Sequence, residues 1–150
     1  MKILLVEDIE YKRDKVIGLL ESISADVSVD VAKSYVSAVN SATSKTYDLI
    51  ILDMSLPTYD KGPNENGGRF RVYGGKDIIR KLMRGKEHPV VVVLTQHTTF
   101  GEIGEQKNTD TLSQELNALM GSKFIGIVKY DSTKPQWKDE IKKKVVQDLL

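Results

Sequence analysis

The sequence of 150 residues contains no cysteine. This absence excludes disulfide bonds, thiol chemistry and zinc sites built from cysteine. The sequence also lacks an excess of charge of either sign, because 22 Lys and Arg stand against 21 Asp and Glu, for a formal charge of +1. We therefore expect no direct nucleic-acid partner, since polyphosphates are usually bound by a clearly basic surface.

Long apolar stretches are missing as well. The longest runs, such as residues 90–94, are far too short to span a bilayer. The N-terminus resembles a signal peptide only as far as Val6, because Glu7 and Asp8 then add acid and no small-residue cleavage site follows. These observations predict no membrane partner and a cytoplasmic location.

The chain does contain a regular alternation of short apolar runs with segments of helical periodicity. Runs rich in Val and Ile, with little polar alternation, are typical of parallel strands that are covered on both faces. The pattern predicts an α/β fold with a doubly wound, five-stranded parallel sheet, in a single domain over residues 1–150 without a separate output domain. The expected strands are residues 3–6, 27–31, 49–52, 90–94 and 124–128.

Two connections exceed the usual length of about 2–6 residues for α/β units. Residues 58–74 are dense in Gly, Asn and Pro, and residues 96–110 form a second polar stretch. Long connections of this kind are often functional or mobile. We therefore expect specialised segments after the third and fourth strands.

The polar residues at the strand ends form the strongest functional pattern. Ligands of an open α/β sheet bind outside the carboxyl ends of its strands. The first strand is followed by Glu7 and Asp8, and the other strand-end residues of interest are Asp53, Thr95 and Lys129. The topology therefore predicts three carboxylates, one hydroxyl and one ammonium group at a single edge of the sheet.

Each of these groups suits phosphoryl chemistry. Clustered carboxylates repel one another unless a cation neutralises them, and Mg²⁺ binds carboxylates together with phosphate oxygens. A carboxylate held beside the metal can attack phosphorus and form an acyl phosphate. A lysine and a threonine hydroxyl can bind the remaining phosphoryl oxygens. The pattern thus indicates a magnesium-dependent phosphoacceptor.

Four motifs resemble the receiver domains of response regulators, the CheY-like family of two-component signalling. They are Leu-Leu-Val-Glu-Asp at 4–8, Asp-Leu-Ile-Ile-Leu-Asp-Met-Ser-Leu-Pro at 48–57, Val-Val-Val-Leu-Thr at 91–95 and Phe-Ile-Gly-Ile-Val-Lys at 124–129. The resemblance implies a flavodoxin-like three-layer sandwich with strand order 2-1-3-4-5. It also implies a signalling phosphoacceptor rather than an enzyme, with autophosphorylation from small donors and autodephosphorylation as accompanying activities.

The resemblance further implies roles for particular residues. The implied Mg²⁺ ligands are Glu7 (mainly through water), Asp8, Asp53 and the backbone carbonyl of Ser55. The implied phosphoryl-handling residues are the acceptor Asp53, the switch hydroxyl of Thr95 and Lys129 as the invariant lysine. The implied partners are a sensor histidine kinase or a histidine phosphotransfer protein, together with an unknown downstream protein.

The chain departs from the family pattern in three places. Gly75 takes the role of the glycine that normally follows Pro57 closely, so that residues 58–74 contain an insertion. Tyr130 rather than proline follows Lys129, and the Lys-Pro pair at Lys134 is a minor alternative for the invariant lysine.

The third departure is Gly126, which stands where the family has an aromatic switch residue. The usual coupling through an aromatic rotamer is therefore not expected. We expect Phe124, Tyr130 or the enlarged loops to transmit the signal instead.

Two other functions stay open. A pseudo-receiver, which binds partners without phosphorylation, is favoured by the insertion at 58–74 and disfavoured by the intact strand-end residues. A phosphatase-like hydrolase would carry a second aspartate two residues after Asp53, where this chain has Ser55. Of the two histidines, we expect His88 to face solvent and His97 to approach the functional edge.

Overall fold

Five short apolar strands form the central sheet of the computed structural model, which describes residues 1–97, 99–101 and 107–150. All are parallel and pair in the order β2-β1-β3-β6-β9, which confirms the predicted order 2-1-3-4-5. The strands end within one residue of the predicted runs, and Thr95 and Lys129 are the last residues of their strands. The strands are β1 (Lys2–Val6), β2 (Ser28–Ala32), β3 (Leu49–Leu52), β6 (Val90–Thr95) and β9 (Phe124–Lys129).

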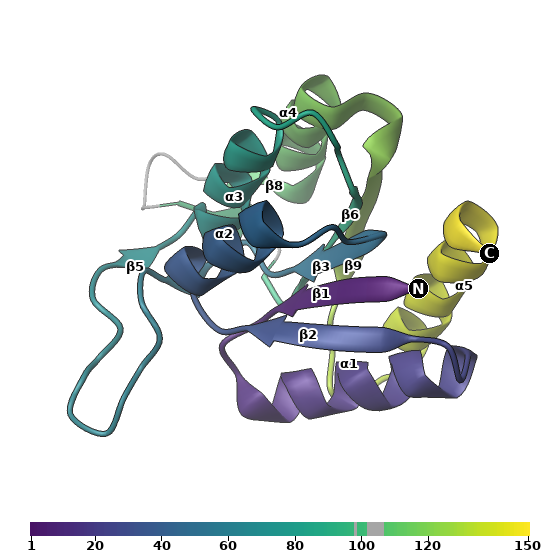
Figure 1. Cartoon of the computed structure of the whole chain (residues 1–150), viewed down its shortest axis with the longest axis horizontal. Helices are drawn as coiled ribbons and strands as arrows, with labels where there is room; N and C mark the ends of the chain where they lie inside the picture. Colours follow the sequence, from purple (N-terminus) through teal and green to yellow (C-terminus); the bar gives the residue numbers. More distant parts are fainter. Residues whose placement is uncertain (98, 102–106) are drawn as a thin grey trace.

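Helices cover both faces of this sheet, so the molecule has three layers (Figure 1). Helices α1 (Glu10–Ile23) and α5 (Gln136–Leu149) lie on one face. The other face carries α2 (Tyr35–Ser44), α3 (Gly74–Leu82) and α4 (Thr109–Met120), which is joined to β9 by the short 3₁₀ helix η1 (Gly121–Lys123). No helix in the described ranges is long and apolar enough to cross a membrane.

The sheet has a hydrophobic core on each side. Side chains of a strand alternate between the two faces, so Leu4 and Ile50 pack under α2, α3 and α4, whereas Ile3 and Ile51 pack under α1 and α5. Each fully buried aliphatic side chain contributes about 1.5–3 kcal/mol of transfer free energy. Burial on both sides explains why the strands read as unbroken apolar runs.

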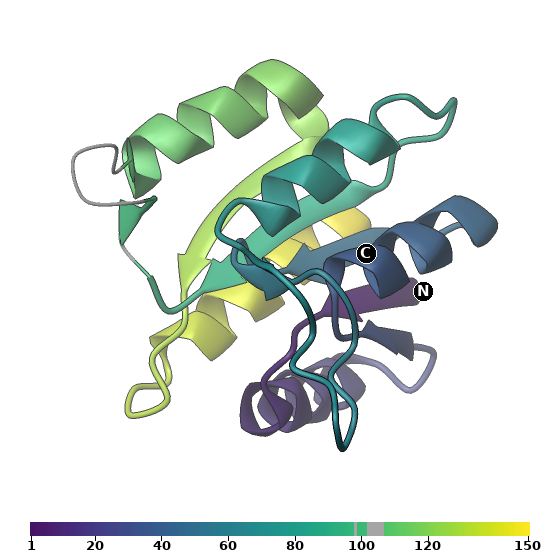
Figure 2. The same cartoon turned by 90° about the vertical axis from the view of Figure 1, so that its left-hand side faces the viewer.

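The insertion after the third strand forms a projecting arm, residues 58–69 (Figures 1 and 2). Its base is an antiparallel hairpin of β4 (Leu56–Pro57) and β5 (Phe70–Arg71), which the sequence pattern did not predict. The N–H of Tyr59 donates to the carbonyl of Gly67 at 2.9 Å and continues the pairing.

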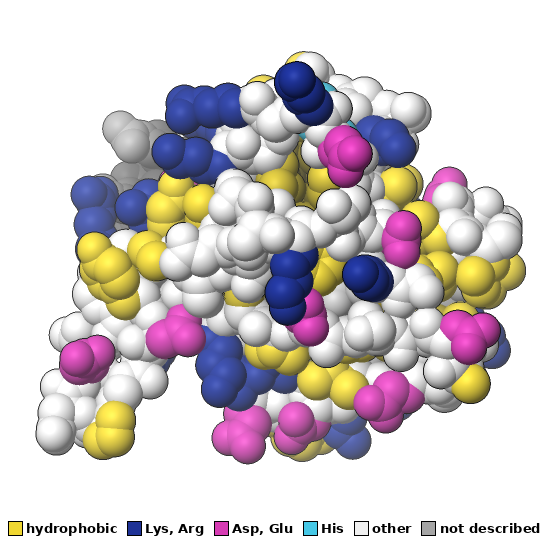
Figure 3. All heavy atoms as spheres, in the orientation of Figure 1, with side chains coloured by type: hydrophobic (Ala, Val, Ile, Leu, Met, Phe, Trp, Pro, Cys, Tyr) yellow, Lys and Arg dark blue, Asp and Glu magenta, His cyan; other side chains and the backbone are white. Residues whose placement is uncertain are grey.

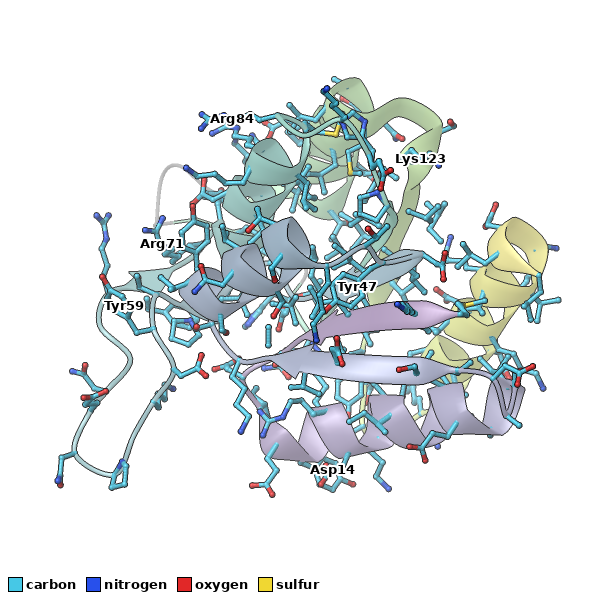
Figure 4. The ribbon with its side chains drawn as sticks, viewed as in Figure 1. Asp14, Tyr47, Tyr59, Arg71, Arg84 and Lys123 are labelled. Atoms are coloured by element: carbon cyan, nitrogen blue, oxygen red, sulfur yellow. The ribbon has the colours of Figure 1, made fainter. Side chains whose placement is uncertain are left out.

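Side chains of α2 fix the base of the arm. Ser34, which caps α2, donates a hydrogen bond to the carboxylate of Asp60 at 2.6 Å. The guanidinium of Arg71 lies 4.0 Å from the ring centroid of Tyr35. Beyond this base the arm stands apart from the rest of the surface (Figure 3), and its residue Tyr59 is exposed (Figure 4).

The second long connection carries another small hairpin. Its strands are β7 (Thr99–Phe100) and β8 (Lys107–Asn108), and Asn108 also caps α4 by accepting the N–H of Thr111 at 2.8 Å. Phe100 is buried in the core under α3 and α4. The remaining part of the predicted insertion, residues 98 and 102–106, lies outside the described residues.

Candidate functional site

Two acidic side chains and one hydroxyl are buried at the carboxyl edge of the sheet. Val6 and Leu52 are paired neighbours on β1 and β3, so the residues that follow them, Glu7 and Asp53, also lie side by side. Only 1% of Glu7, 4% of Asp53 and none of Thr95, at the end of β6, is exposed. The predicted topology therefore brings these three residues together.

A fourth residue, which the sequence analysis did not identify, supplies the positive charge. The ammonium group of Lys12, on α1, lies 2.5 Å from Oε1 of Glu7 and 3.1 Å from Oδ2 of Asp53. It also donates a hydrogen bond to the backbone carbonyl of Leu94 at 2.7 Å. Lys12 is only 2% exposed, so its charge is compensated almost entirely by the site.

The phase of α1 explains the position of this lysine. Lys12, Val16 and Leu20 are the buried residues of the helix and follow one another at intervals of four, which places them on one face. The ring centroid of Tyr130 lies 5.4 Å from the ammonium nitrogen. Lys12 precedes Val16 by one turn, so the sequence indicates that it shares the buried face of the helix, but not that its ammonium group turns inward.

The second oxygen of each carboxylate binds the backbone. Oδ1 of Asp53 accepts the N–H of Met54 at 2.7 Å, and Oε2 of Glu7 accepts the N–H of Ile9 at 3.1 Å. Burial raises the pKa of Glu7 to about 7, although the charge of Lys12 opposes the rise, and the charge of Asp53 adds to it. The low-dielectric setting makes these few charges strongly interdependent.

Asp8 lies at the border of the site. Its carboxylate is 15% exposed and stands 3.9 Å from the ammonium of Lys61, a residue of the arm. Ser55 is buried, and its hydroxyl donates to the carbonyl of Val72 at 3.0 Å. This bond joins the loop after Asp53 to the segment that leads into α3.

The acidic residues suit a divalent cation in chemistry and charge. Three carboxylates and the ammonium of Lys12 leave a formal charge of −2, which Mg²⁺ balances, and all donors are oxygen atoms. In the described residues, however, no three acidic or histidine side chains are already grouped around a metal position. Lys12 lies between Glu7 and Asp53 and occupies part of that space.

Lys129, the predicted invariant lysine, is exposed at the end of β9. It stands in register with Thr95, but no ion pair joins it to Asp53, although the structure describes both residues. Asp53 thus contacts Lys12 instead. The role assigned to Lys129 stays a prediction.

A bulge in β9 accompanies the outward position of Lys129. Val92 of β6 faces two residues of β9, Ile125 and Gly126, because the pairing shifts by one residue there. Gly126 has φ +119°, a conformation that glycine adopts readily and other residues rarely do. The residue that replaces the family's aromatic switch is therefore the residue that permits the bulge.

The glycine assigned to the start of the third helix has a clear steric role. A Cβ on Gly75 would lie 2.6 Å from Cδ1 of Leu52 and 2.7 Å from the carbonyl oxygen of Asp53. Helix α3 begins at Gly74, and the N–H of Gly75 donates to the carbonyl of Met54 at 2.8 Å. Glycine at this position thus allows the start of α3 to lie close to Asp53 and Met54.

The two histidines differ from each other. The N–H of His97 donates to the hydroxyl of Thr95 at 3.2 Å, so this residue does approach the functional edge through its backbone. His88 is half-buried, and its Nε2 lies 2.9 Å from the carbonyl oxygen of Gly85 in an exposed hydrogen bond. Lys134, the minor alternative to Lys129, is exposed.

Comparison with known proteins identifies the family. Residues 3–111 match the response regulator receiver domain. The Detocs response regulatory protein DtcB of Enterobacter cloacae is 31% identical over 150 residues, which cover 98% of this chain and 99% of that protein. The chain therefore belongs to the response regulator receiver family, whose members are signalling modules.

Solved structures show the same fold at low sequence identity. The receiver domain of a DNA-binding response regulator from Colwellia psychrerythraea has a TM-score of 0.63 at 17% identity, with 98% of this chain and 99% of that chain covered. The receiver domain of a sensor histidine kinase from Pseudomonas aeruginosa has a TM-score of 0.60 at 19% identity, with 95% and 94% covered. That crystal structure contains a magnesium ion in its active site cleft.

Proposed function

We propose that this receiver is a phosphoacceptor and that Asp53 takes a phosphoryl group from a sensor histidine kinase or a histidine phosphotransfer protein. One observation carries the proposal: the carboxylate of Asp53 lies at the end of β3, almost fully buried, in contact with the ammonium of Lys12 and beside Glu7. A buried carboxylate with a cation and no apolar packing role is typical of a reactive position rather than a structural one.

The proposed reaction is a direct transfer. One carboxylate oxygen of Asp53 attacks the phosphorus of a phosphohistidine, the new O–P bond forms, and the P–N bond breaks as the imidazole leaves with its electron pair. The N–H of Met54 and the ammonium of Lys12 keep the carboxylate oriented. Burial excludes most water, which slows hydrolysis of the resulting acyl phosphate.

Mg²⁺ is the proposed metal, held by Asp8, Asp53 and the backbone carbonyl of Ser55, with Glu7 acting mainly through water. The oxygen donors and the residual charge of −2 support this assignment. When bound, the metal neutralises phosphoryl oxygens in the transition state.

The proposed output runs through Thr95. A phosphoryl group on Asp53 offers strong acceptors to the Thr95 hydroxyl, which now accepts the N–H of His97. The ring of His97 lies edge-on to that of Phe100, with centroids 6.4 Å apart, and the carbonyl of Phe100 accepts the hydroxyl of Tyr73 at 3.0 Å. A shift at Thr95 is therefore linked to β7 and α3, where we propose that an unknown downstream protein binds.

A direct test uses intact-protein mass. Wild type and Asp53→Asn are incubated with Mg²⁺ and acetyl phosphate, with EDTA added to a parallel sample. We expect a Mg²⁺-dependent gain of one phosphoryl group in the wild type and none in the variant. An equal gain in Asp53→Asn would contradict the choice of acceptor.

A pseudo-receiver is the second candidate function. The observation that favours it is the contact of Lys12 with both buried carboxylates, because an internal ammonium can stabilise the site permanently without a phosphoryl group. The same experiment decides between the two. No mass gain in the wild type, with binding of Mg²⁺ demonstrated, favours the pseudo-receiver.

A further inference from the structure

We infer that Lys12, from the first turns of α1, supplies the ammonium group that binds the phosphoryl group on Asp53, in place of Lys129 at the end of β9. The inference rests on the proposed function and names a further residue of the same site. Its basis is a difference between two lysines: Lys12 contacts the acceptor at 3.1 Å, whereas Lys129 is exposed.

The contacts of Lys12 match the capacity of an ammonium group. A lysine carries three N–H donors, and Lys12 donates hydrogen bonds to Asp53 and to the carbonyl of Leu94 and forms an ion pair with Glu7 at 2.5 Å. Two of these partners, Glu7 and Leu94, form no bond to the phosphoryl group in the proposed transfer. Lys12 can therefore keep both contacts while the third is exchanged from the Asp53 oxygen to a phosphoryl oxygen.

The surroundings hold the start of α1 in this position. The guanidinium of Arg13 donates to the carbonyl of Glu7 at 3.2 Å and to that of Asp8 at 2.8 Å, which ties the helix to the end of β1. The ring of Tyr130 lies beside the ammonium, at 5.4 Å from centroid to nitrogen, and itself packs on Trp137 at 5.0 Å between ring centroids. Lys12 is therefore preorganised, so little conformational entropy is lost when it binds phosphate.

The other lysine stays at the surface. Beyond the bulge at Gly126, Lys129 pairs with Thr95 at the end of β6, yet its side chain is exposed and no ion pair joins it to Asp53, both being residues that the structure describes. Val128 and Tyr130 pack in the core under α1 and α5, whereas Lys129, between them, is exposed.

A hydrogen bond stabilises this arrangement. The ammonium of Lys144, on α5, donates to the carbonyl of Ile125 inside the bulge at 2.5 Å. A Cβ on Gly126 would lie 3.0 Å from the same nitrogen. The bulge is thus bonded to the neighbouring helix.

The charge of Lys12 has a defined part in the transfer. As the O–P bond to Asp53 forms and the bond from phosphorus to the leaving group breaks, the negative charge of the phosphoryl oxygens replaces that of the free carboxylate. Lys12 keeps all its protons and neutralises one of these charges. It is therefore a phosphoryl-binding residue and not a proton donor.

The test compares Lys12→Met with Lys129→Met, two substitutions of the same type. Each protein is incubated with Mg²⁺ and acetyl phosphate, and the rate of the one-phosphoryl mass gain is measured. We expect the rate to fall about 100-fold in Lys12→Met, as for the loss of one charged stabiliser, and to stay within about twofold in Lys129→Met. The opposite pattern overturns the inference and leaves the proposed function intact, whereas no gain in any of the three proteins overturns both.

A double variant keeps the test decisive if Lys12→Met does not fold. Glu7→Gln with Lys12→Met removes one charge of each sign, so the formal charge of the buried group is unchanged. Its rate is compared with that of Glu7→Gln alone, and a fall of about 100-fold supports the inference. Equal rates in these two proteins overturn it.

A second readout needs no phosphoryl transfer. Mn²⁺ binding to the unphosphorylated proteins is measured from the electron paramagnetic resonance signal of the free ion. Removal of a positive charge that contacts two of the acidic residues raises cation affinity, so we expect about tenfold tighter binding in Lys12→Met and no change in Lys129→Met. A purely structural role for Lys12 predicts weaker binding, and that result overturns the inference.

Discussion

The start of α1 and the end of β9 each bring a lysine towards the acceptor edge, and the two lysines lie in opposite environments. Lys12 is 2% exposed and contacts the buried carboxylates of Glu7 and Asp53. Lys129 is exposed, on a strand whose register is shifted by the bulge at Gly126. Lys12 shares the buried face of its helix with Val16 and Leu20, whereas Lys129 is the last residue of its strand, at the edge of the sheet.

The comparison teaches that two elements on different sides of the sheet can place an ammonium group near the same carboxylate. In this receiver a helix approaches the acceptor from one side of the sheet, and the last strand reaches the same edge. Either element can carry an ammonium group to Asp53. In this structure the ammonium group that contacts Asp53 comes from the helix, whereas Lys129 is exposed.

The largest expected effect that separates the two regions is on stability. Lys12→Met leaves two buried carboxylates without their cation, so we expect the free energy of unfolding to fall by about 3–5 kcal/mol. Lys129→Met changes an exposed residue and should shift it by less than about 0.5 kcal/mol. Urea unfolding followed by far-ultraviolet circular dichroism at pH 7.5 measures both. Similar losses in the two variants would contradict the environments described above.

A double-mutant cycle sharpens the same contrast. Asp53→Asn and Lys12→Met affect groups in direct contact, so their effects on unfolding should be coupled by about 1–3 kcal/mol. Asp53→Asn combined with Lys129→Met should be additive within about 0.5 kcal/mol. A coupling to Lys129 as large as that to Lys12 would place both lysines at the acceptor.

A pair of glycine substitutions tests the backbones of the two regions. Gly126→Ala forces a residue with a Cβ into φ +119° and against the ammonium of Lys144, so we expect a loss of about 1–3 kcal/mol. Gly18→Ala, on α1, meets no atom within 4 Å of the added Cβ and should raise stability by about 0.5–1 kcal/mol. The free energy of unfolding from urea titration measures both, and a neutral Gly126→Ala would show that the bulge is not required.

Much of the fold could be predicted because its signals are local. The strands are continuous runs of Val, Ile and Leu, and such runs follow from burial on both faces. The positions of Glu7, Asp53 and Thr95 then follow from topology alone, because the carboxyl ends of parallel strands meet at one edge. The sequence alone therefore predicts these parts of the site.

Lys12 was missed because its role depends on the phase of a helix. A lysine one turn before Val16 usually extends its ammonium group to solvent while its methylenes pack on the protein. Only the position of α1 against β1 and β3 shows that Lys12 turns inward to the carboxylates. That position is set by tertiary packing, which periodicity does not contain.

The exposure of Lys129 has a similar cause. A glycine inside a strand suggests a bulge, but the sequence does not say on which side of the glycine the register changes.

The hairpin of β4 and β5 was missed for a different reason. Its pairs, such as Pro57 with Phe70, are separated by the arm and show no alternation of apolar and polar residues.

A smaller effect on stability is expected when the hydroxyl of Tyr47 is removed. Tyr47 is buried like Tyr130 at the end of β9, but its hydroxyl has a hydrogen-bond partner. Its hydroxyl donates to the carboxylate of Asp30 at 2.6 Å, and this bond lowers the pKa of Asp30. A lowered pKa stabilises the fold above the ordinary value of Asp, about 3.9, and this stabilisation is lost as the pH falls through the folded value.

Tyr47→Phe should therefore cost about 1 kcal/mol at neutral pH, since the carboxylate of Asp30 is 42% exposed and solvent weakens the bond. The difference from wild type should disappear at low pH, where Asp30 is protonated in both states. Urea unfolding at several pH values measures it. A difference that stays constant down to the protonated range would mean that the charge of Asp30 plays no part.

The smallest effect is expected at Tyr130 itself. Its hydroxyl is buried and has no hydrogen-bond partner among the described residues, whereas its ring packs on Trp137. A buried unpaired hydroxyl is a cost to the fold, so Tyr130→Phe should leave the free energy of unfolding unchanged or raise it by up to about 1 kcal/mol. Tyr130→Ala, which removes the ring, should instead lose about 3–5 kcal/mol.

Because the ring beside Lys12 supports the ammonium and the hydroxyl does not, Tyr130→Phe should also accept a phosphoryl group at the rate of the wild type. A slower rate with unchanged stability would mean that the end of β9 acts on the acceptor through this hydroxyl, and the contrast between the two regions would then be weaker than their lysines suggest.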